Sequence, residues 1–61
     1  MNEPIILSFT DYQAIESGKN PTAMEEIMNK MADEGQIYIV KKDGTDYKVA
    51  LTEKGVGLVP M

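Results

Sequence analysis

The sequence predicts one small α+β domain with two helices ahead of a C-terminal β-hairpin, and two patterns carry this prediction. Apolar residues recur at the i, i+3, i+4 and i+7 spacing of a helical face, at Met24, Ile27, Met28 and Met31. Two β-rich runs, 37–40 and 47–51, flank Asp43-Gly44, a dipeptide that favours a tight hairpin turn. The chain of 61 residues has room for one domain, 1–61.

The first third of the chain is predicted to form a short strand followed by a short helix. Residues 4–9 (PIILSF) are an apolar run with two isoleucines, which is typical of a strand. Either Ser8 or Thr10 can cap the helix, because both side chains can accept a hydrogen bond from the first helical turn. We expect this helix to end at Ser17, with Gly18 suited to the left-handed conformation that often follows a helix.

The second helix carries the methionine stripe. Asn20 can cap it with Pro21 at the first helical position, or Thr22 can cap it with Glu25 completing a capping box. Gly35 is expected to close it. We favour a core position for the stripe, since apolar helical stripes usually face the core, over the alternative of an adaptable methionine-rich binding surface. The polar side of this helix holds Glu25, Glu26, Asn29, Lys30 and Asp33.

Alternation of side chains divides the hairpin into two faces, whether its loop is Asp43-Gly44 or the longer 43–46. The face assigned to the core comprises Tyr38, Val40, Tyr47, Val49 and Leu51. The other face mixes apolar and charged side chains and comprises Ile37, Ile39, Lys41, Asp46, Lys48 and Ala50. A hairpin with such a half-apolar second face needs a cover. Residues 56–61 are predicted to form a short third strand or a tail that packs on the rest.

Composition narrows the function classes. The chain has no cysteine, histidine or tryptophan, which excludes disulfides, histidine- or cysteine-based zinc sites and nucleophiles that depend on those residues. We expect no enzyme activity, no metal and no cofactor, because the pairs of carboxylates are best interpreted as solvent-exposed helix surface. The chain has ten acidic residues, six lysines and no arginine, so its net charge is −4. This charge disfavours binding to nucleic acid and to anionic membranes. No apolar run is long enough to span a bilayer and the start lacks a basic segment, so we expect a cytoplasmic protein.

The order strand, short helix, longer helix, hairpin resembles a winged helix without its first helix. The stretch 31–37 looks like the end of a recognition helix running into a wing, and Leu51-Thr52-Glu53-Lys54-Gly55 resembles the stretch after the wing in MarR-type regulators. The resemblance covers roughly residues 5–55 and implies a winged-helix-like β-α-α-β-β module. The sequence departs from the family because the helix at the recognition position is acidic. The resemblance therefore implies nucleic-acid contacts only at the lysines of the wing, Lys41, Lys42 and Lys48.

These observations lead us to expect a small acidic protein-binding module. Its partner would present a basic surface to the outward residues Glu25, Glu26, Asn29 and Asp33, because charge complementarity gives specificity and fast association. A phage-type or mobile-element inhibitor or regulator is one version of this function. The alternative is a minimal dimeric winged-helix DNA-binding transcriptional regulator that uses the wing lysines. A homodimer is also expected, since a chain this short buries little surface and has no disulfide or zinc to stabilise it.

Overall fold

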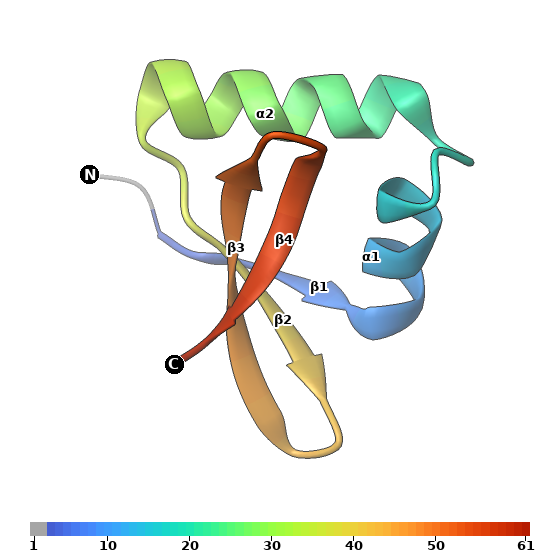
Figure 1. Ribbon diagram of the computed structural model, residues 1–61. Helices are drawn as coiled ribbons and strands as arrows, with labels where there is room; N and C mark the ends of the chain where they lie inside the picture. Colours follow the sequence, from blue (N-terminus) through green and yellow to red (C-terminus); the bar gives the residue numbers. More distant parts are fainter. Residues whose placement is uncertain (1–2) are drawn as a thin grey trace.

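The computed structural model describes residues 3–61 and confirms the α+β class (Figure 1). Two helices and a four-stranded mixed sheet make up this part of the chain. The elements in chain order are β1 (Ile5–Ser8), α1 (Phe9–Glu16), α2 (Pro21–Glu34), β2 (Tyr38–Lys42), β3 (Thr45–Thr52) and β4 (Gly55–Pro60). The strands lie in the sheet in the same order as in the sequence.

The sheet combines one parallel and two antiparallel pairs. β1 runs parallel to β2, with Ile5 opposite Tyr38. Parallel neighbours need a long crossover connection, and α1 and α2 together provide it. β2–β3 and β3–β4 are both antiparallel hairpins. Of the two predictions for the end of the chain, the strand is confirmed, because β4 pairs with β3 from Thr52↔Gly55 to Tyr47↔Pro60.

Local capping decides where the helices begin and end. Ser8 caps α1, its Oγ accepting a hydrogen bond from the Asp11 N–H at 3.1 Å, whereas Thr10 lies inside the helix. Asn20 caps α2, its Oδ1 accepting from the Ala23 N–H at 3.2 Å, with Pro21 at the first helical position. Gly35 closes α2 in the left-handed conformation at φ +66°.

The β2–β3 turn is the two-residue version of the predicted loop, with Lys42 opposite Thr45. Asp43 and Gly44 both have positive φ, +51° and +77°. A type I′ turn needs positive φ at both central residues, and its backbone twist matches the twist of the strands it joins. The Asp-Gly prediction is therefore confirmed at its turn.

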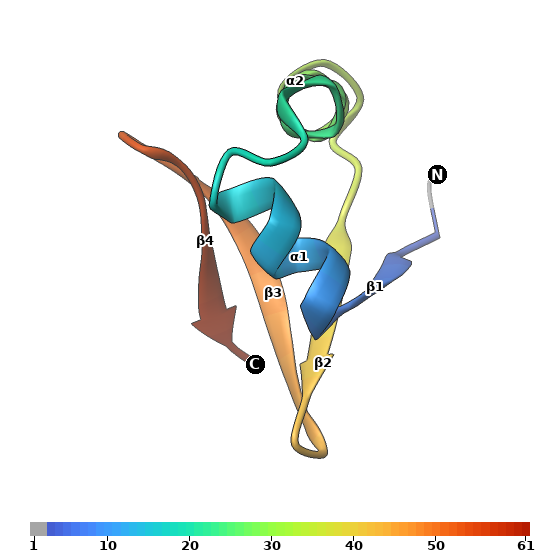
Figure 2. The ribbon, with the colours of Figure 1, turned by 90° about the vertical axis from the view of Figure 1, so that its right-hand side faces the viewer.

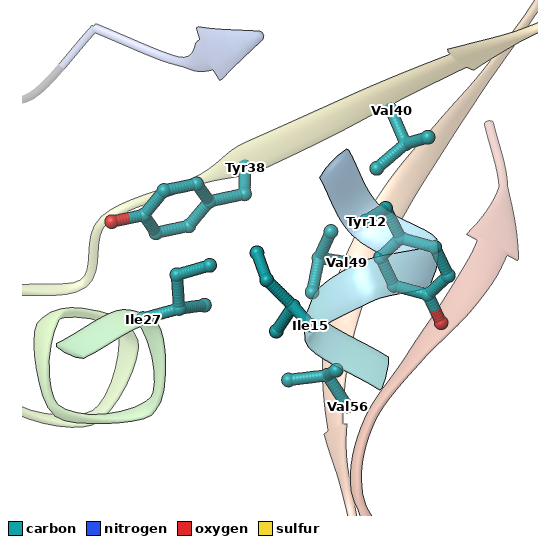
Figure 3. Close-up of a cluster of buried hydrophobic side chains, with 7 residues drawn as sticks. All are labelled: Tyr12, Ile15, Ile27, Tyr38, Val40, Val49 and Val56. Atoms are coloured by element: carbon teal, nitrogen blue, oxygen red, sulfur yellow. The ribbon is translucent and has the colours of Figure 1, made fainter. Parts of the chain in front are cut away.

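The core lies between the two helices and one face of the sheet (Figures 2 and 3). Within residues 3–61 the buried apolar side chains are Tyr12, Ile15, Ile27, Tyr38, Val40, Val49 and Val56. The methionine stripe faces this core as expected, since Ile27 is buried while Met24, Met28 and Met31 pack half-buried around it.

Two residues of the predicted core face depart from expectation, Tyr47, which is only half-buried and lies outside the core cluster, and Leu51. Leu51 is 47% exposed, although Tyr38, Val40 and Val49 on the same face are buried. Leu51 lies beside the C-terminal end of α2, where Met31 and Gly35 line the same hollow. Because the helix ends at this point, it does not extend over Leu51.

Candidate partner-binding surfaces

The acidic helix face comprises Glu25, Glu26, Asn29 and Asp33, all of which the structure leaves exposed on α2. The helical period explains this arrangement, because burying Ile27 turns these positions away from the core. This surface contains a shallow depression of about 400 Å³, which is lined by Thr22, Glu25, Glu26, Asn29 and Lys30. Three carboxylates and one amide thus lie on a helix that is capped at both ends.

One of these acids already has a basic neighbour. Lys30 Nζ lies 3.2 Å from Glu26 Oε1, the i,i+4 arrangement that stabilises helices by about 0.2–0.5 kcal/mol. The hydrogen bond to the Glu26 carboxylate, reinforced by its charge, raises the pKa of Lys30 above its ordinary value. Lys30 therefore stays charged across the physiological range, and Glu25 and Asp33 carry most of the uncompensated charge of the acidic helix face.

The hairpin lysines do not form one cluster. Strand alternation places Lys41 and Lys48 on the sheet face turned away from the helices, with Lys48 opposite Ile39. Lys42 lies on the helix side, and its Nζ is 4.7 Å from the centroid of the Phe9 ring. This cation–π contact holds Lys42 against α1, so the residues available together near the hairpin are Lys41 and Lys48.

The sheet face turned away from the helices is apolar at its centre, and we call it the open sheet face. One row of paired residues crosses all four strands there and comprises Ile6, Ile39, Lys48 and Val59. Ile6 is 54% exposed and Val59 48% exposed. Sequence alternation indicated Ile39 and Lys48 on this face, but Ile6 and Val59 could be placed on it only once the pairing of β1 and β4 was known.

A hollow of about 430 Å³ adjoins this row where β3 and β4 pass the end of α2. Its apolar lining is contributed by Met31, Ile37, Val49, Ala50, Leu51 and Val59. Large apolar side chains scattered singly over a surface are ordinary, whereas a contiguous group of them marks an interaction site. The open sheet face and its hollow form such a group.

A second groove, of about 360 Å³, lies on the helix side between β1, α1 and α2. Its lining is largely apolar and includes Ile15, Ile27 and Tyr38. Glu26 and Lys30 line both this groove and the depression on α2.

Burial raises the pKa of the Tyr12 hydroxyl, with a smaller contribution from the Glu16 charge. Tyr12 is therefore a neutral core residue at physiological pH.

Within residues 3–61, no group of three or more carboxylate side chains is placed to hold a metal ion. In the same part of the chain, neither helix has the length and apolar character needed to cross a membrane. Comparisons of the chain with protein-family models, with curated proteins and with solved structures find no significant match. The candidate sites are accordingly defined by the surfaces of this chain.

Proposed function

We propose that the chain is a small non-enzymatic module that binds a protein partner with a basic surface through the acidic helix face. The observation that carries this proposal is the exposure of Glu25, Glu26 and Asp33 along the outward side of α2. With a net charge of −4, the whole chain adds to the negative field that this helix presents.

The position of α2 suits it for recognition. Its ends are set by Asn20 and Gly35, and Ile27 anchors it in the core. A rigid surface requires little rearrangement on binding, so more of the interaction energy appears as affinity. Charge complementarity then steers the encounter and selects the partner. A phage-type or mobile-element inhibitor or regulator, which occupies a nucleic-acid-binding site of its partner by presenting similar charge, is one version of this function.

Reversing the charge of the acidic helix face should abolish partner capture. The test compares the full wild-type chain with the triple variant Glu25→Lys/Glu26→Lys/Asp33→Lys as baits in a host lysate, with captured proteins identified by mass spectrometry. The variant is expected to lose the specific partners, because like charges across an interface cost several kcal/mol.

A matched variant controls for the change in net charge. Glu3→Lys/Glu16→Lys/Glu53→Lys makes the same charge change at exposed positions outside α2. It is expected to retain the partners, and circular dichroism checks that both variants are folded. A helix variant that keeps every partner of the wild type would contradict the proposal.

The second candidate is a minimal winged-helix-like regulator that binds DNA as a dimer. The observation in its favour is a hairpin that follows α2 and carries Lys41 and Lys48 on one face. Binding through phosphates would weaken steeply with salt, so a labelled DNA duplex should be shifted at about 50 mM salt and released at about 200 mM. Lys41→Glu/Lys48→Glu should remove the shift, and no shift of wild-type complexes at low salt would end this candidate.

A further inference from the structure

We propose that the open sheet face binds a second copy of this chain, so that two sheets stack face to face with the helices on the outside. This inference is independent of the proposed function, which uses the acidic helix face. It concerns a surface formed by all four strands, whose central row is Ile6, Ile39, Lys48 and Val59. Stacked sheets pack about 10 Å apart, with side chains of the two inner faces interdigitating.

The first argument is the apolar character of this face. Ile6, Ile37 and Val59 are among the exposed large apolar side chains, at 54%, 37% and 48%. On the other side of the sheet the comparable positions Tyr38 and Val40 are 4% and 0% exposed, because the helices cover them. The open sheet face has the composition of a buried layer without a covering layer from within residues 3–61.

The second argument is the charge pattern, which suits another copy of this chain. Asp46 and Lys48 lie two residues apart on β3 and therefore point to the same side. Neither forms an ion pair within the described chain. In a two-fold interface residue i meets residue j while j meets i. A two-fold axis beside Tyr47 would place Lys48 of each copy against Asp46 of the other, forming two ion pairs.

The net charge of the whole chain is not concentrated on the open sheet face. The chain carries −4, which repels a second copy at long range. The charged residues of the open sheet face are Lys41, Lys48 and Asp46, two positive and one negative. The net charge of this face is therefore small, and most of the charge that repels a second copy lies elsewhere on the chain.

The size of the face sets the expected strength. Four strands about 4.8 Å apart, with an average length of about 20 Å, present roughly 400 Å² in projection. Two such faces, with Met31 and Leu51 beside them, reach about 1,000 Å² of total buried area, the lower bound for a specific interface. We therefore expect a dimer whose population rises with concentration rather than a permanent one.

Pairing through the edge of β4 is less favourable. Met61 N–H donates to Asp46 O at 3.3 Å, so the backbone groups of residue 61 face β3. Alternation then turns the nitrogen of Pro60 outward, and this nitrogen carries no hydrogen. A proline at an outward position of an edge strand discourages the addition of another strand. Stacking of the faces needs no such donor.

The experiment measures the mass of the full chain by sedimentation equilibrium from about 10 μM to 2 mM, a range chosen to bracket a weak dimer. The wild type is expected to move from monomer to dimer. Val59→Lys and Ile6→Lys each place a charge in the apolar row and should weaken dimerisation about tenfold or more. The control Glu25→Lys lies on the acidic helix face and reduces the net negative charge, so it should not weaken the dimer, and circular dichroism checks that each variant is folded.

A charge swap tests the intermolecular pairing itself. Asp46→Lys alone and Lys48→Asp alone each oppose like charges across the two-fold axis and should remain monomeric. Mixing these two variants should restore association, because each then supplies the charge that the other needs, while every contact within a protomer stays as it was in the separate variants. A wild type that stays monomeric at 2 mM, a dimer that survives Val59→Lys and Ile6→Lys, or a mixture that fails to associate would each overturn the proposal.

Discussion

Replacing Ile27 by alanine is expected to lower the free energy of unfolding by about 2–5 kcal/mol, the usual cost of truncating a buried isoleucine. Ile27 is 6% exposed and is the buried residue that α2 contributes to the core (Figure 3). At about 0.05–0.15 kcal/mol per residue, a chain of 61 residues has roughly 3–9 kcal/mol of stability in total. Ile27→Ala should therefore leave a large unfolded fraction at 37 °C, measured by urea denaturation.

Ile6→Ala is the matched control for this change. The substitution is chemically the same, but Ile6 is 54% exposed on the open sheet face. At a few micromolar, where self-association is negligible, it should cost less than about 1 kcal/mol, as surface substitutions usually do. Equal losses for the two variants would show that α2 is not held by its core contact.

Gly55→Ala is expected to lower the free energy of unfolding by about 2–4 kcal/mol, through backbone strain together with a steric contact. Gly55 has φ of +126°, a conformation that side chains rarely adopt. A Cβ at this position would lie 3.2 Å from Met24 Cε and 3.3 Å from Met24 Sδ. Because Gly55 joins the β3–β4 turn to the underside of α2, the change should also loosen the helix, seen as a lower urea midpoint and weaker helical dichroism.

Two substitutions at Gly35 measure the cost of a side chain at positive φ without a steric contact. Gly35 also has positive φ, +66°, but a Cβ there would meet nothing within 4 Å. Gly35→Ala should cost about 1–2 kcal/mol, the left-handed penalty alone, and Gly35→Asn less, since asparagine tolerates this conformation. If Gly55→Ala were no more destabilising than Gly35→Ala, the contact with Met24 would have no energetic weight.

Features that depend on residues close together in the chain could be predicted from the sequence alone. Asn20-Pro21 and Gly35 bound α2 through contacts within one turn, and the apolar period placed Ile27 inward and the acidic helix face outward. Asp43-Gly44 predicted the β2–β3 turn, because a type I′ turn needs positive φ at both central residues and Asp-Gly favours that conformation. Candidate site residues on the outer side of a helix were predictable for the same reason.

Features that join distant parts of the chain could be seen only in the folded structure. Whether residues 56–61 form a strand depended on β3 as a hydrogen-bonding partner, and the parallel pairing of β1 with β2 depended on both helices lying between them. The same long-range pairing brought Ile6 and Val59 onto one surface with Ile39 and Lys48, and it placed Lys42 over Phe9 instead of beside Lys41. The open sheet face therefore arises from strand order, which fixes neighbours that no local pattern in the sequence specifies.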